Sequence, residues 1–144
     1  MSHLPSIGAI VLAVLAAPAE AAIGEAPKST YLLCKGALWS HESGFGSSAS
    51  TPGTTTVRVD HGAQKLTFQT LMLGELQGEL KSTEELYSSR VDLPKAHAHM
   101  GRSVAMVEIS VNRFTGRASI SYVLADGGKF PGFVGECQLA SPKF

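Results

Sequence analysis

The sequence predicts a mainly β domain: a single antiparallel meander of about seven or eight strands, preceded by a signal-peptide helix. Short segments of alternating apolar and polar residues dominate the chain, and Gly- and Asp-containing turn signals separate them at regular spacing. Two cysteines lie near the two ends of the domain. Because a bridge between them would join the ends of the meander, a small barrel is favoured over a sandwich, and closure also removes exposed sheet edges.

The first twenty-one residues have the pattern of a cleavable export signal. An apolar run from Ile7 to Ala17 is followed by Ala19-Glu20-Ala21, a small-x-small site that places cleavage after Ala21. The run is too short to cross a bilayer of about 30 Å, which takes about 20 apolar residues. A buried N-terminal core helix is the alternative. The predicted organisation is a signal peptide at 1–21, a flexible mature N-terminus at 22–30 and a single β domain at 31–144.

The composition of the mature chain excludes several classes of protein. Removing 21 of the 144 residues leaves 123, enough for one domain. All 12 basic residues remain against 11 of the 12 acidic ones, and the basic residues are scattered singly. Nucleic-acid binders usually show a clustered basic excess, so no nucleic-acid partner is expected. No second apolar stretch has the length of a membrane span, and we expect neither a span after cleavage nor a cofactor.

The first half of the domain is expected to open with a strand and continue as a hairpin. The opening strand is predicted at 31–39. Residues 54–59 alternate and are rich in β-branched side chains, which fits a half-buried strand. Asp60-His61-Gly62 is a turn signal that leads into a further strand at 65–71, so these two strands are expected to pair.

The middle of the chain is compatible with more than one structure. Alternation in 75–81 places Leu76, Gly78 and Leu80 on one face, although leucines in this region also have helical spacing. Each glycine costs a helix about 1 kcal/mol relative to alanine, so a strand is favoured. Residues 84–91 are predicted to form a further strand or a short helix.

The C-terminal half carries the strongest hairpin signal, from strand 104–111 to strand 117–124. The loop between them ends at Gly116, which suits a positive φ in a bulged hairpin. Asp126-Gly127-Gly128 marks the next turn, before a last strand at 130–139. Three sets of residues are expected to share one face of their strand: Val107, Ile109 and Val111; Ala118, Ile120, Tyr122 and Leu124; and Phe133, Gly135, Cys137 and Leu139.

The two cysteines, Cys34 and Cys137, are expected to form a disulfide. An isolated pair in an exported chain usually does so, and this bridge would close a loop of about a hundred residues. The chain-entropy model assigns such a loop about 4–5 kcal/mol of stability. The alternative, a redox-active or metal-binding pair, lacks a C-x-x-C spacing and a neighbouring His.

Most of the predicted strands are joined by tight turns, but two connections are expected to be long loops. These two loops hold most of the candidate catalytic and metal-binding residues. The loop at 40–53 contains His41-Glu42-Ser43, but adjacent residues on a Gly/Ser-rich loop rarely converge as nucleophilic catalysis requires. The loop at 92–103 contains His97 and His99, whose H-x-H spacing points both imidazoles the same way on an extended chain. These two are the weak metal-ligand candidates. No third ligand is identifiable, so a solvated pair is favoured over a zinc site.

Two residues beside turns and several aromatic residues are candidates for a recognition surface. Asp60 is expected to cap backbone donors, and Arg113 to point into solvent. If the aromatic residues cluster on the surface they form a binding patch, and otherwise they belong to the core. These aromatic residues are Trp39, Phe45, Phe114, Phe130 and Phe133.

Four short motifs lie along the mature chain: Tyr31-x-Leu33-Cys34-x-Gly36, Val57-x-Val59-Asp60, Asn112-Arg113-x-Thr115-Gly116 and Gly135-x-Cys137. With the signal peptide before them, they resemble those of small uncharacterised exported bacterial β-domain proteins with one disulfide. The resemblance covers most of the mature chain. It implies a periplasmic or secreted location and a Cys34–Cys137 bridge. It carries over no activity, because that family has no assigned catalytic residues.

These observations favour a non-catalytic periplasmic binding or interaction module. Its partner is expected to be a protein or small-molecule ligand of the cell envelope, bound by the two long loops or the barrel mouth. The alternative from another class is a small secreted hydrolase or a metal-dependent enzyme that uses His97 and His99. An inhibitor of an exported hydrolase, a lipocalin-like carrier and an envelope structural component are further alternatives.

Overall fold

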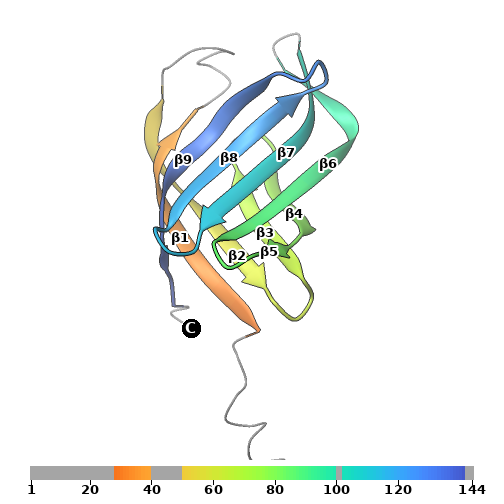
Figure 1. The fold of residues 1–144 in the computed structure, drawn as a ribbon. Coiled ribbons are helices and arrows are strands. Elements are labelled where there is room, and N and C mark those ends of the chain that lie inside the picture. Colours follow the sequence, from red (N-terminus) through yellow and green to blue (C-terminus); the bar gives the residue numbers. More distant parts are fainter. Residues whose placement is uncertain (1–27, 40–49, 100–101, 142–144) are drawn as a thin grey trace, which may run out of the picture.

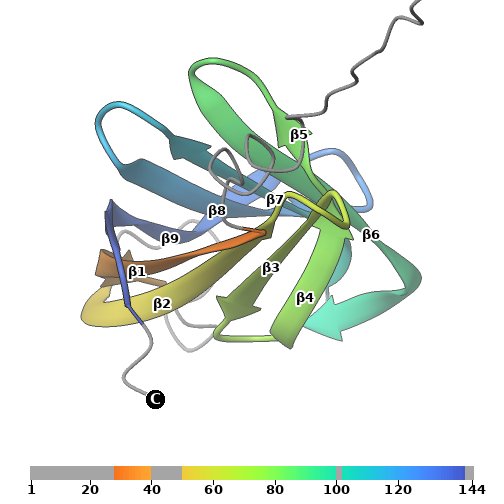
Figure 2. The same ribbon diagram turned by 90° about the horizontal axis from the view of Figure 1, so that it is seen from below.

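A computed structural model describes residues 28–39, 50–99 and 102–141, without the side chains of 95–99 and 102. One antiparallel sheet of nine strands curls into a nearly closed barrel (Figures 1 and 2). The described residues contain no helix. The strands are β1 (Ser29–Leu38), β2 (Thr51–Asp60), β3 (Lys65–Thr70), β4 (Gly74–Glu79), β5 (Lys81–Ser82), β6 (Leu86–His99), β7 (Arg102–Asn112), β8 (Arg117–Leu124) and β9 (Lys129–Leu139).

The sheet is a meander whose two ends are joined. Its strand order is β4-β3-β2-β1-β9-β8-β7-β6-β5, so β1 against β9 is the only neighbouring pair of this sheet that is not consecutive in the chain. Cys34 lies opposite Cys137 in that pair, and the two are bonded as a disulfide. The predicted bridge and the predicted approach of the first and last strands are therefore confirmed.

The strand count is nine rather than about seven or eight, because the strand predicted at 75–81 is broken at Leu80. Up to Glu79 the chain pairs with β3, and from Lys81 it pairs with β6. Between them the buried Leu80 donates its backbone N–H to the carbonyl of Gln64, at 2.9 Å. One strand thus changes partner halfway along its length, and its two parts count separately.

The seam between β4 and β6 is closed by side chains. The buried Ser89 on β6 donates its hydroxyl to the carbonyl oxygen of Glu79, at 2.8 Å. A Cβ on Gly78 would overlap the side chains of Ser89 and Val91, so glycine is what lets β6 approach β4 here. The seam is therefore packed, although β4 and β6 share no ladder pairs in the described sheet.

The prediction of a loop at 92–103 is wrong, because most of this segment is strand. β6 continues to His99 and pairs with β7 at His97↔Val104 and His99↔Arg102. The register shifts between Asp92 and His97, around Pro94. Proline has no N–H to give to a ladder and is tolerated at such irregularities, so it interrupts the pairing without ending the strand. For residues 84–91 the structure shows the strand alternative from Leu86 onward.

Alternation along the strands fills the barrel with apolar side chains. The faces predicted for 107–111 and 118–124 are buried as expected. Leu139 differs from the others in its set, because it lies at an end of the barrel and is 79% exposed. The largest fully buried side chains are Tyr122, Phe68, Phe133, Leu66 and Ile120. The interior between the strands is thus occupied by the protein's own core.

One end of the barrel is closed by the turn between β3 and β4. Met72 and Leu73 in this turn pack against the core. The buried ring of Tyr122 stacks on Phe130, with ring centroids 5.0 Å apart, and its hydroxyl makes hydrogen bonds with the Thr70 side chain and the Met72 backbone. The opposite end, at the bottom of Figure 1, carries the β2–β3, β5–β6 and β7–β8 turns.

Tyr122→Phe is expected to make stability less sensitive to alkaline pH. Burial raises the pKa of Tyr122 above its ordinary 10.0, more than its two hydrogen bonds lower it. The folded state therefore favours the protonated phenol, and this stabilisation is complete below pH 10 and is lost as pH rises through the folded-state value. At pH 8 the variant should be about 1 kcal/mol less stable, through lost hydrogen bonds. Urea unfolding at pH 8 and pH 11 should show a smaller difference in the free energy of unfolding between wild type and variant at pH 11.

The matched control is Tyr31→Phe, at a side chain that is 42% exposed. The expectation is contradicted if the difference in the free energy of unfolding between wild type and Tyr122→Phe is the same or larger at pH 11.

Several predicted features lie outside the described residues. They are the leader at 1–21 with its cleavage site at Ala21, most of the expected flexible segment at 22–30, His41-Glu42-Ser43, and Phe45. Within the part of the chain that is described, no helix has the length and apolar character of a membrane span.

Candidate functional site

A hollow of about 350 Å³ opens at the end of the barrel that carries the β7–β8 turn. We call it the mouth hollow. Leu32 on β1, Val111 on β7 and Cys137 on β9 line it, and all three belong to the core or pack against it. The exposed Phe114 and Leu139 also line it, so apolar surface extends from the core outward to solvent.

The β7–β8 turn holds Phe114 out in solvent. The Asn112 side-chain oxygen accepts hydrogen bonds from the backbone N–H groups of Phe114 and Thr115, both at 2.9 Å. The turn closes with a bond from Gly116 N–H to Asn112 C=O at 2.9 Å, and Gly116 has φ 78°, as expected from the sequence. With its backbone fixed in this way, Phe114 is 72% exposed.

Arg113, next to Phe114, is anchored at three points. Its backbone N–H bonds to the carbonyl of Glu85 at 2.7 Å, and its Nη1 donates to the carbonyl of Thr83 at 2.6 Å. Its guanidinium lies over the ring of Tyr87, 4.6 Å from the centroid. The sequence predicts that Arg113 points into solvent. It is exposed, but these contacts hold it against the β5–β6 turn, which the sequence did not place beside it.

His61 approaches the same tyrosine from the β2–β3 turn. The rings of His61 and Tyr87 meet edge to face, with centroids 5.7 Å apart. The backbone N–H of His61 bonds to the carbonyl of Lys28 at 2.8 Å, and its Nε2 lies 3.3 Å from the Thr30 hydroxyl. Tyr87 therefore connects two turns that are far apart in the sequence.

The contact between the Thr30 hydroxyl and His61 resembles a nucleophile beside a base, but it lacks, among the described residues, the third group that would orient the imidazole. Such a pair needs a third group that holds the imidazole, usually a carboxylate bonded to its other nitrogen. Among the described residues, no carboxylate accepts a hydrogen bond from the His61 ring. The arrangement places the apolar side chain of Phe114 beside the Arg113 guanidinium at the same hollow.

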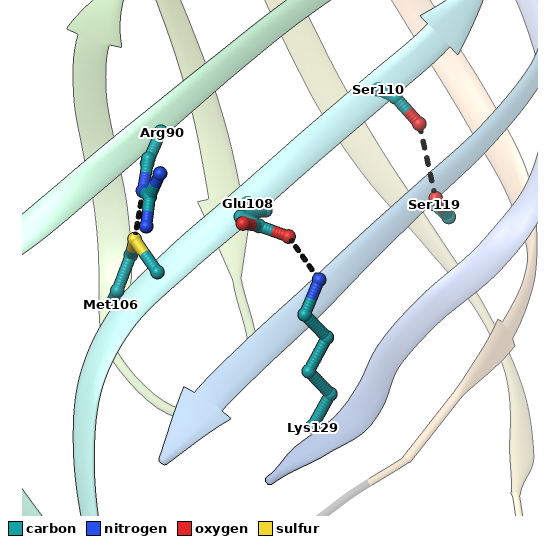
Figure 3. Close-up of polar contacts among 6 residues, drawn as sticks. All are labelled: Arg90, Met106, Glu108, Ser110, Ser119 and Lys129. Atoms are coloured by element: carbon teal, nitrogen blue, oxygen red, sulfur yellow. Dashed lines mark hydrogen bonds and ion pairs between the residues drawn. The ribbon is translucent and has the colours of Figure 1, made fainter. Parts of the chain in front are cut away.

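A second hollow, of about 250 Å³, lies on the outer face of β6, β7 and β8. Arg90 bonds to the Met106 sulfur, Glu108 forms an ion pair with Lys129 at 3.0 Å, and the hydroxyls of Ser110 and Ser119 lie 3.2 Å apart (Figure 3). These side chains make polar contacts with one another across the strands, as on the solvated face of an antiparallel sheet. The mouth hollow is the stronger candidate, because it is the larger of the two and two of its large apolar lining residues, Phe114 and Leu139, are exposed.

The other predicted site residues have separate outcomes. Asp60 caps its turn as expected, since its Oδ1 accepts from the Ala63 backbone N–H at 2.9 Å. His97 and His99 lie in β6, and their side chains are outside the description. Among the described side chains, no group of three or more His, Cys, Asp or Glu could hold a metal ion. The metal-dependent alternative thus stays a prediction.

The four candidate aromatic residues that the structure describes do not gather into one patch. Phe133 is buried, and Phe130 stacks on Tyr122 at the closed end. Trp39 is half-buried, and its backbone N–H donates to the Gly132 carbonyl at 3.1 Å. Phe114 is the exposed one among those described. The residue missed by sequence reasoning is Tyr87, because the alternation around it was compatible with either a strand or a helix.

Comparison with known proteins provides no relative for this chain: no protein-family model, no curated protein and no solved structure matches it.

Proposed function

We propose that this protein is an exported, non-catalytic binding module that holds an apolar group of its ligand or partner in the mouth hollow. The observation that carries the proposal is the pair of large apolar side chains at this hollow, Phe114 at 72% and Leu139 at 79% exposure. Large apolar side chains that stay exposed at a concave site are typical of binding surfaces. The bonds that fix the β7–β8 turn support the same role, because a rigid site loses less entropy on binding.

The filled interior separates this proposal from a lipocalin-like carrier. A carrier holds its ligand inside the barrel, in a cavity between the strands. Here Tyr122, Phe68 and Phe133 occupy that space as fully buried side chains. We therefore place the ligand at the end of the barrel rather than within it.

Export is part of the proposal and rests on two features. The leader at 1–21 has the pattern of a secretory signal. The disulfide between Cys34 and Cys137 is compatible with an oxidising compartment. Protein recovered from the extracytoplasmic fraction of an expressing bacterium should begin at Ala22.

The binding test uses N-phenyl-1-naphthylamine, an uncharged dye that fluoresces when it leaves water. The protein should enhance its fluorescence, and the double variant Phe114→Ser/Leu139→Ser should lose at least tenfold in affinity, because each removed apolar side chain is worth about 1.5–3 kcal/mol when buried. The matched control is Leu71→Ser/Val134→Ser, which removes two other exposed apolar residues (51% and 42%) that do not line the hollow. Absent dye binding, or equal losses in both double variants, would overturn the proposal.

A further inference from the structure

We infer that the mouth hollow selects short amphiphilic carboxylates, with the carboxylate on the Arg113 guanidinium and the hydrocarbon chain against Phe114 and Leu139. This inference rests on the proposed function, and it adds the chemical class of the ligand. Three features of the hollow carry it: an arginine held in place, the absence of an ionic partner for that arginine within the described structure, and apolar side chains in the lining beside it.

Arg113 is pre-positioned for a ligand. Its guanidinium is stacked 4.6 Å from the Tyr87 ring centroid and bonded to the Thr83 carbonyl, so the planar group cannot rotate freely. Arginine loses less entropy per hydrogen bond than lysine because its donors form a rigid fork, and fixing that fork reduces the loss further.

The donors of this guanidinium are only partly used. Arginine has five N–H donors, and one side-chain bond of Arg113, that of Nη1 to Thr83, is formed within the described structure. Stacking on Tyr87 occupies a face of the group and leaves the in-plane donors accessible. The ion pairs of the described residues are Arg58–Asp60 and Lys129–Glu108, neither of which involves Arg113. The hollow thus presents an arginine that forms no ion pair among the described residues, and a guanidinium can bind a carboxylate through two parallel hydrogen bonds.

The rest of the hollow suits a hydrocarbon chain. Leu32 and Val111 lie within it, and Phe114 and Leu139 extend the apolar surface to solvent. Its volume of about 350 Å³ is near the lower end of the range of about 300–1,000 Å³ for ligand sites. A short chain fits this size, whereas a long-chain lipid would need the barrel interior that the core occupies.

The test compares three molecules with the same eight-carbon chain: octanoate, 1-octanol and octyltrimethylammonium. Affinities come from isothermal titration calorimetry, and amide shifts of Phe114 and Thr115 in ¹⁵N NMR spectra locate the binding. Octanoate should bind about tenfold more tightly than octanol, because hydrogen bonds to a charged group are stronger than those between neutral groups. Octyltrimethylammonium should bind more weakly than octanol, because Arg113 repels it.

Arg113→Gln should abolish the preference for octanoate and leave the affinity for octanol within about twofold. Arg117→Gln is the matched control: it removes the same charge from an exposed arginine beside the same turn that does not line the hollow, and it should keep the preference. Because Arg113 also ties down the β5–β6 turn, Arg113→Lys is measured too. It should fold and keep a reduced preference.

The two proposals fail in different ways. If the naphthylamine dye binds at the mouth but octanoate and octanol bind equally, or Arg113→Gln keeps the preference, the inference about carboxylates is overturned and the binding module stands. If the dye does not bind, the proposed function itself fails.

Discussion

Gly36→Ala is expected to lower the free energy of unfolding by about 3 kcal/mol, because it forces apart the two strands that close the barrel. Gly36 on β1 lies opposite Gly135 on β9. A Cβ on Gly36 would overlap the carbonyl of Val134 and the Cα of Gly135, which are backbone atoms and cannot turn aside as a side chain would. The β1–β9 pairing would have to separate locally, and urea unfolding followed by circular dichroism measures the cost.

The matched control for this variant is Gly62→Ala in the β2–β3 turn. A Cβ there would meet only the Asp60 carboxylate oxygen, at an ordinary contact distance of 3.6 Å. The control should therefore change stability by less than about 0.5 kcal/mol. If Gly36→Ala unfolds at the same urea concentration as the control, the close approach of β1 and β9 is not what stabilises the closure.

Reduction of the disulfide is expected to destabilise the protein by about 4 kcal/mol, the second large effect. The bridge joins residues separated by 103 positions, and a loop of this length greatly restricts the unfolded chain. Urea unfolding with and without dithiothreitol measures the difference. Against a typical total of about 5–15 kcal/mol, the bridge would supply a large share of the free energy of unfolding.

The double variant Cys34→Ala/Cys137→Ala separates the bridge from other effects of the reductant. It should be about as unstable as the reduced wild type, and dithiothreitol should not shift its transition further. If the wild-type protein unfolds at the same urea concentration with and without dithiothreitol, the bridge contributes nothing to stability. Alkylation with iodoacetamide before and after reduction gives the thiol count that the interpretation needs.

The sequence predicted the strands well where a single face is buried. Val107 and Ile109 on β7 alternate with polar residues as regularly as Tyr122 and Ile120 opposite them on β8, so both the pairing and the inward face followed from the pattern. Cys34 and Cys137 predicted the closure because a covalent bond fixes a contact that the pattern alone leaves open.

The features that the sequence could not predict depend on tertiary contacts. The change of partner at Leu80 follows from the position of β3, which begins at Lys65 opposite Glu79, and of β6, whose Ser88 lies opposite Lys81. The local alternation is the same on either side of it. The strand around Pro94 was mistaken for a loop because local composition suggests an interruption, whereas pairing with β7 resumes at His97. For the mouth hollow, Phe114 and Arg113 were candidates, but Tyr87 was not. Stacking between Arg113 and Tyr87 joins two hairpins, and no sequence spacing encodes it.

The pairing of β1 with β9 also has a consequence for the order in which the chain can acquire its structure. The first strand of the domain needs the last one as its neighbour, so a chain emerging from its N-terminus first cannot close the barrel until residues 129–139 are available. Contacts this distant in sequence slow folding, because a long loop must be ordered before they form. Late closure of this kind keeps a chain unfolded for longer, and a chain that must be threaded through a membrane before it folds would gain from that delay.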